Sequence, residues 1–291
     1  MSTVLIATLA GVVAAIGWGT GDWLTAKLSK KFDQLAVNFG ANIPGLVVML
    51  PILLMADQPI PAGGFLARMW LAGTLISCGF LCMVTALRSG AVGIVVPLSN
   101  IYAILTLALS TIFIGSVFNS WQSVAIVIIV TGAVLLAYEK NNKKIPLKEL
   151  HRETFFALAA ATIWGVAFFV VDTMVGSFTW YVLAGWMTVF MTLDSILLVV
   201  ITNGSMALKA LSRPLKSKTV WLAGFAFQFG ATGFYLGSEK AGSVVIPAVI
   251  AAAAPLVSSA LAAFYDHERV SVVKRLGAAV VVTGIIVLNL V

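Results

Sequence analysis

Long apolar segments separated by short polar breaks run through the whole chain. A bilayer core about 30 Å thick needs roughly 20 apolar residues in each helix that crosses it. Segments of that length recur from one end to the other, and only two connections, 139–153 and 203–218, are long. The pattern predicts ten transmembrane helices, at approximately 4–25, 34–55, 67–87, 92–113, 120–138, 154–174, 179–202, 219–238, 243–265 and 270–291.

The composition agrees with a membrane protein. Of the 291 residues, 60% are hydrophobic and 10% are charged, whereas a soluble protein carries about 25% charged residues. A surface facing water on all sides cannot be built from this composition, so the fold class is an all-α, multi-pass membrane protein. The sequence before the first apolar segment has no basic region, and no cleavable signal is expected.

The basic residues fix an expected orientation. Of the 18 Lys and Arg residues, only Arg68 and Lys240 fall on one side of the predicted helices. Cytoplasmic loops carry the excess of Lys and Arg in membrane proteins. Both termini are therefore expected outside a cytoplasmic membrane, with 139–153 as a basic cytosolic linker. The net charge of +7 is explained by topology, and no nucleic-acid partner is expected.

The two halves of the chain repeat each other. The segment AAIGWG at 14–19 matches AATIWG at 160–165, which superposes Trp18 on Trp164. Near the end of each half, VTGAVLL at 130–136 matches VTGIIVL at 282–288. The sequence therefore predicts a duplicated unit.

Each unit holds five predicted helices, so the second copy enters the membrane inverted. We expect a first repeat at 1–138, the linker at 139–153 and an inverted second repeat at 154–291. In secondary transporters built this way, the substrate binds near the midplane between the repeats, and access alternates by rocking of one repeat against the other.

This layout resembles the ten-span EamA-type branch of the drug/metabolite transporter superfamily. The resemblance is carried by Trp18-Gly19, Trp164-Gly165, Lys27 at the end of the first span, and HERVSVVKRLGAAVVVTG at 267–284. The acidic residue of that family falls on Glu268 in the second half and on Ser116 in the first. The resemblance implies secondary transport of a small organic metabolite and no enzymatic activity.

The segment AIGWGTGDW at 15–23 predicts one side of a substrate site. A carboxylate inside a span is costly and faces a cavity in most proteins, and Asp22 shares a helix face with Trp18. An aromatic ring beside a carboxylate suits an amine or another cation, and Asp22 can also carry a coupling ion. The alternative is that Asp22 reaches the interface and pairs with Lys27. The matching face of the second repeat carries Trp164 and Phe168.

A second acidic residue and several amides add candidates. Asp194, on a face with Trp186, is the deepest carboxylate, and it either binds a coupling proton or sodium ion or pairs with a hydroxyl or amide in the bundle. Polar side chains in three other spans either line a substrate cavity or form hydrogen bonds between helices. These side chains are Asn38, Asn42, Asn100, Tyr102, Gln228 and Tyr235.

The sequence lacks the motifs of nucleotide-binding proteins and metalloproteins. There is no Gly-rich phosphate loop and no metal-ligand cluster, and Cys78 and Cys82 are expected to be packing residues. We expect no cofactor and no metal. The predicted function is alternating-access transport of an amino acid, sugar or amine by a monomer or homodimer in the bilayer. The alternatives are an exporter of hydrophobic cations or drugs, a flippase for lipid-linked precursors, and a membrane scaffold.

Overall fold

The computed structural model describes residues 3–56, 58, 60–88, 92–137, 147–267 and 271–289. Most of the predicted linker at 139–153 and the acidic Glu268 lie outside these ranges. Everything below concerns the described residues.

Ten apolar helical segments cross the bundle, as the sequence predicts. Eight segments are long and apolar enough to span a membrane. The other two are α6, which is shorter, and α10, which carries more polar residues. The uninterrupted helices are α1 (Thr3–Leu28), α2 (Gln34–Met55), α3 (Gly64–Leu87), α6 (Ser120–Ala137), α7 (Leu147–Asp172), α8 (Trp180–Asn203), α10 (Lys218–Ala241) and α13 (Val272–Asn289).

The remaining two spans are interrupted at corresponding places in the two halves. The fourth span consists of α4 (Val92–Ser99), α5 (Tyr102–Leu109) and the π-helical η1 (Ser110–Ile114). The ninth span consists of α11 (Val245–Ala251) and α12 (Ala254–Tyr265). A proline lies before each break, at Pro97 and Pro247. Non-helical backbone at membrane depth is tolerated where protein surrounds it, and Asn100 at the first break is buried.

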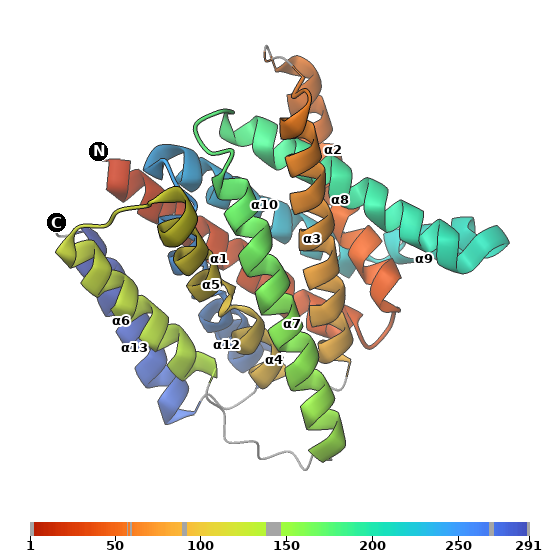
Figure 1. Ribbon diagram of the computed structural model, residues 1–291. Helices are drawn as coiled ribbons and strands as arrows, with labels where there is room; N and C mark the ends of the chain where they lie inside the picture. Colours follow the sequence, from red (N-terminus) through yellow and green to blue (C-terminus); the bar gives the residue numbers. More distant parts are fainter. Residues whose placement is uncertain are drawn as a thin grey trace.

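The packing follows the two-fold symmetry of an inverted repeat. Helix α1 packs along α10, and its counterpart α7 packs along α3, the counterpart of α10. The pairs α2–α8 and α6–α13 are each related to themselves by the same operation. Figure 1 shows α6 and α13 side by side and both termini on one side of the bundle, which we call the terminal side. The opposite side, where α7 begins, is the linker side.

Glycines let the two central helix pairs approach closely. A Cβ atom on Gly17 would fall on the backbone of Gly230 in α10, so no side chain fits there. The indole of Trp18 lies over Gly230, and that of Trp164 lies over Gly79. Helix α1 stays continuous, so these glycines serve close approach and not a local unwinding. Small residues play this role where membrane helices pack tightly.

The connection at 203–218, for which the sequence analysis predicted no helix, contains a short one. The 3₁₀ turn η2 (Gly204–Met206) leads into α9 (Ala207–Leu215). Nine residues are too few for a transmembrane pattern, and Pro214 argues against a helix in sequence reasoning. The helix forms because its buried face packs on the bundle.

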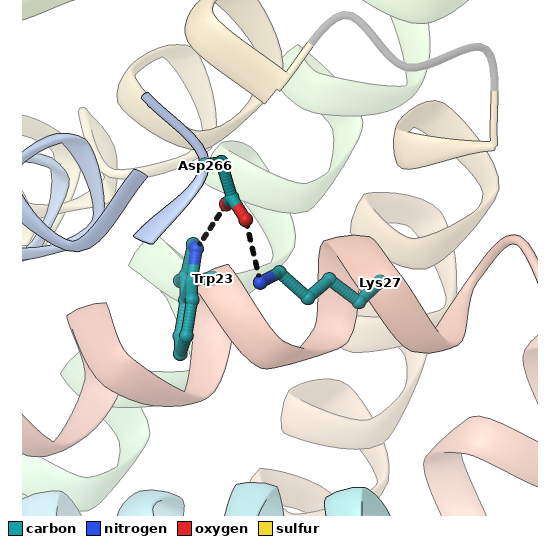
Figure 2. Close-up of polar contacts among 3 residues, drawn as sticks. All are labelled: Trp23, Lys27 and Asp266. Atoms are coloured by element: carbon teal, nitrogen blue, oxygen red, sulfur yellow. Dashed lines mark hydrogen bonds and ion pairs between the residues drawn. The ribbon is translucent and has the colours of Figure 1, made fainter. Parts of the chain in front are cut away.

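On the linker side, three side chains tie α1 to the end of α12. Figure 2 shows the Asp266 carboxylate accepting hydrogen bonds from Trp23 Nε1 at 2.7 Å and from Lys27 Nζ at 2.8 Å. The Lys27 ammonium also lies 3.8 Å from the centre of the Trp23 ring. These bonds, with Lys27 the larger influence, lower the pKa of Asp266. Lys27 therefore pairs with Asp266, and the alternative pairing of Lys27 with Asp22 is not formed.

Candidate functional site

A cavity of about 910 Å³, its open mouth included, lies where the two halves meet. Its walls come from α1, α2, α3, the break between α4 and α5, α7, α8 and α10. Nine of the side chains that the sequence singled out line it: Trp18, Asp22, Asn42, Asn100, Tyr102, Trp164, Phe168, Gln228 and Tyr235. The structure thus brings together residues spread over more than 200 positions of the chain.

Aromatic rings from both halves form one wall of the cavity. Trp18 stacks on Phe168, with ring centroids 5.7 Å apart and planes at 24°. Tyr102 lies between the two repeat-related tryptophans, 6.4 Å from Trp18 and 6.1 Å from Trp164. Behind this wall, the fully buried Phe234 contacts both Trp18 and Phe168. Phe234 was not selected from the sequence, because it is one of four phenylalanines in α10 and no local pattern distinguishes it from the others.

Asp22 supplies the negative charge of the cavity. Asp22 is 4% exposed, and the side chain of Asn100, which also lines the cavity, lies beside it. No lysine or arginine is among the described residues that line the cavity, and Lys27 is engaged with Asp266. A buried carboxylate is costly without a partner, so the site favours a cation, or a proton on Asp22, and disfavours an anion.

Two polar groups in the wall are left for a ligand. The Tyr102 hydroxyl and Gln228 Nε2 are buried and have no hydrogen-bond partner among the described residues. The other end of the Gln228 amide accepts a hydrogen bond from Thr188 Oγ1 at 3.2 Å. Buried polar groups are rarely left unpaired in proteins. A bound molecule with a hydrogen-bonding group would satisfy them.

Some residues of the cavity were missed by sequence reasoning. Thr188 and the apolar Ile76, Phe80, Met187 and Phe227 also line it. Apolar side chains in a span carry no mark that separates cavity lining from lipid contact. Thr188 could have been selected from the sequence, because it is a polar residue inside an apolar span, one turn from the small Ala184.

Asn38 and Trp186 lie outside the cavity. Asn42 Nδ2 lies 3.3 Å from the Met191 carbonyl and 3.4 Å from Ser195 Oγ, which links α2 to α8. Asn38 is buried next to it and is not among the lining residues. Trp186 stacks on Phe190 with centroids 5.7 Å apart. Trp186 and Phe190 belong to the same helix, so this contact lies along α8. For Asn38, Oδ1 accepts a hydrogen bond from Asn42 Nδ2 of the same helix at 3.5 Å, and Nδ2 has no partner among the described residues. The hydrogen bond between helices that was the alternative for Asn38 is therefore not formed among the described residues.

Asp194 is also outside the cavity, in a seam between α3 and α8. Its Oδ2 accepts a hydrogen bond from Thr74 Oγ1 at 2.7 Å, and its Oδ1 accepts one from Trp70 Nε1 at 3.1 Å. Trp70 is 52% exposed, so this seam faces outward from the bundle. Both carboxylate oxygens have a partner, which corresponds to the hydroxyl pairing considered for Asp194. Asp22 is left as the acidic residue of the cavity.

The described residues offer no metal centre. No group of three or more His, Cys, Asp or Glu side chains among them is placed to hold a metal ion.

The chain is similar to known proteins in family, in sequence and in fold. The model of the EamA-like transporter family matches residues 5–138 and again residues 151–290. An uncharacterized protein of Methanocaldococcus jannaschii is 30% identical over 136 residues, which cover 45% of this chain and 96% of that protein. That relative is therefore about as long as one half. A solved crystal structure of a protein shares the fold, with a TM-score of 0.67, 19% identity and 98% of each chain covered.

Proposed function

Because this chain belongs to the EamA-like transporter family, we propose that it moves a small amine-bearing metabolite across the cytoplasmic membrane by alternating access. One observation carries the choice of substrate: Asp22 is buried in an aromatic-walled cavity whose described lining holds no basic residue. The amine can belong to an amine proper or to an amino acid. A sugar, also considered from the sequence, would leave the Asp22 charge uncompensated.

Each group of cavity residues would contact a different part of the substrate. The ammonium group of the substrate would lie against the Asp22 carboxylate and over the rings of Trp18 and Trp164, where ring electrons attract a cation. The unpaired Tyr102 hydroxyl and Gln228 amide would hydrogen-bond to an acceptor elsewhere on the substrate. Phe168 would close the site against Trp18.

Coupling follows from the same carboxylate. Asp22 can hold an ammonium ion or a proton, but one buried carboxylate cannot hold both. Substrate binding would therefore release a proton, and the return of the empty carrier would carry one back. A sodium ion is the other coupling ion that a carboxylate and the Asn100 side chain would accommodate.

Alternating access would use the two-fold arrangement of the halves. Opening the cavity toward the linker side requires α1 to move from α12, and the bonds of Asp266 to Trp23 and Lys27 oppose this movement. Opening toward the terminal side requires Trp18 and Phe168 to separate. The contacts that would close the linker side are hydrogen bonds and an ion pair to Asp266, whereas the contact that would close the terminal side is the stacking of Trp18 on Phe168.

An exporter of hydrophobic cations is the second candidate, because the same carboxylate and rings suit a large organic cation. A flippase for lipid-linked precursors fits less well, since phosphate headgroups need cationic partners and the described lining has none.

A thermal-shift screen with matched pairs of ligands tests the proposal. Purified protein is melted with amines and with the carboxylates of the same carbon skeleton. We expect a subset of the amines to raise the melting temperature and the matching carboxylates to leave it unchanged, because a ligand that binds only the folded state stabilises it. Hits are then tested by counterflow in liposomes. Stabilisation by carboxylates and not by amines would reject the proposed substrate class.

The proposed orientation has its own test. The charge distribution supports termini on the outside and the linker in the cytoplasm. In a background with Cys78 and Cys82 replaced, a single cysteine at Asn141 should resist a membrane-impermeant thiol reagent in intact cells and react after the cells are opened. Reaction in intact cells would reverse the orientation.

A further inference from the structure

Helix α9 (Ala207–Leu215) carries three separate faces around its short axis. One face is buried against the bundle, one is apolar and exposed, and one is basic and exposed. An exposed apolar face is unfavourable in water, and an exposed basic face is unfavourable in the bilayer core. Helices with both lie in the plane of the membrane interface.

The buried face fixes α9 to α2. Ala207 and Pro214 are buried, and Pro214 packs beside Gly40 of α2. At the end of α9, the Leu215 carbonyl accepts a hydrogen bond from Trp221 Nε1 at 2.9 Å. The position of α9 on the linker side is therefore set by contacts with the protein.

The apolar exposed face has no protein cover among the described residues. On α9 itself this face carries Leu208, which is 79% exposed. Two apolar side chains just before α9 are also exposed: Met206 of η2, at 55%, and Ile201 of α8, at 69%. Moving these side chains from water into the acyl region of the bilayer is favourable, because it removes apolar surface from contact with water.

The basic face lacks acidic neighbours along the chain. Lys209 and Arg213 are exposed one turn apart on α9, and Lys216 and Lys218 follow as exposed residues. Between Asp194 and Glu239 the sequence contains no acidic residue. Basic residues beside a membrane surface attract anionic headgroups.

We propose that α9 is a binding site for anionic phospholipid in the leaflet on the linker side. Leu208 and Met206 contact the acyl chains, while Lys209 and Arg213 contact the headgroup phosphates. The occupied site holds α9 against Gly40, next to Ala41 and Asn42 of the cavity wall. Lipid binding thus steadies the part of α2 that lines the cavity. This inference does not depend on the identity of the substrate.

Native mass spectrometry of the full-length protein tests the site with defined lipids. Phosphatidylglycerol and phosphatidylcholine with the same acyl chains are titrated into the purified protein. The parent should bind phosphatidylglycerol more tightly, and the double variant Lys209→Gln/Arg213→Gln should lose about twenty-five-fold in affinity for it, from about fivefold per basic residue. Both side chains are exposed, and the contact of Arg213 with the Phe32 ring at 5.9 Å is the one cation–π contact among the described residues that the variant removes. The melting temperature without lipid should therefore fall only slightly.

The matched control is Arg152→Gln/Arg275→Gln, which removes two exposed basic residues near the starts of α7 and α13, away from the turn that Arg213 contacts. This control should keep the affinity of the parent. Hydrogen exchange should also slow in residues 34–45 when phosphatidylglycerol is added to the parent, and this slowing should be absent in the α9 variant. Absence of a headgroup preference in the parent, or equal affinity of the two double variants, would overturn the proposal.

Discussion

Replacement of Trp18 by alanine is expected to abolish transport while the protein remains folded and inserted. The indole stacks on Phe168 at 5.7 Å and lies 5.2 Å from Phe234, so it forms the centre of the aromatic wall. Its loss removes aromatic contacts of about 0.5–1.5 kcal/mol each and a cation-binding surface of about 0.5–2 kcal/mol. We therefore expect substrate affinity to fall by roughly thirty-fold or more, measured by counterflow with an amine found in the screen.

Two further variants separate binding from packing. Trp18→Phe keeps a ring over Gly230 and should retain part of the transport. Trp121→Ala removes a tryptophan of α6 that is 60% exposed and distant from the cavity lining, and it should transport like the parent. Normal counterflow by Trp18→Ala would show that the ring only packs the helices.

Replacement of Asp22 by asparagine should remove amine binding more completely. Truncating one partner of a buried charge pair costs about 2–5 kcal/mol, equivalent to a loss of affinity of about thirty-fold to several thousand-fold. The folded state should survive, because the amide of asparagine is uncharged and has nearly the volume of the carboxylate that it replaces. The variant isolates the charge of Asp22 from its volume.

The pH dependence distinguishes the parent from this variant. In the parent, a proton and an ammonium ion compete for Asp22, so acidification should weaken amine binding. In Asp22→Asn this competition is absent, and the residual binding should not depend on pH through this site. Isothermal titration in two buffers of different ionisation enthalpy should also detect proton release in the parent and not in the variant.

The internal repeat is the feature of the sequence that led to the candidate site. Trp18 and Trp164 occupy corresponding positions, and an inverted repeat brings corresponding positions together near its axis, as the contacts of both rings with Tyr102 illustrate. Polar residues in the spans then added Asn100, Gln228 and Tyr235. Local sequence could not say which polar face points inward, because Asn38 and Asn42 share a helix face and only Asn42 lines the cavity.

Other features depend on contacts that a linear pattern does not encode. Asp194 is deep in its span, as expected, but Thr74 and Trp70 of α3 hold it in a seam away from the cavity. Helix α9 forms because Pro214 packs against Gly40, which is far away in the sequence. The sequence does not assign a role to Gly17 of α1, because only the neighbouring backbone of Gly230 shows that it serves the close approach of two helices.

Counterflow by Asp22→Asn and Asp194→Asn in parallel tests the central claim most directly. Both variants replace one carboxylate within a span by an amide, but only Asp22 lines the cavity. Liposomes loaded with the amine identified by the screen would take up labelled amine through the parent and through Asp194→Asn, and would not do so through Asp22→Asn. Uptake by Asp22→Asn at the rate of the parent would contradict an amine site centred on Asp22.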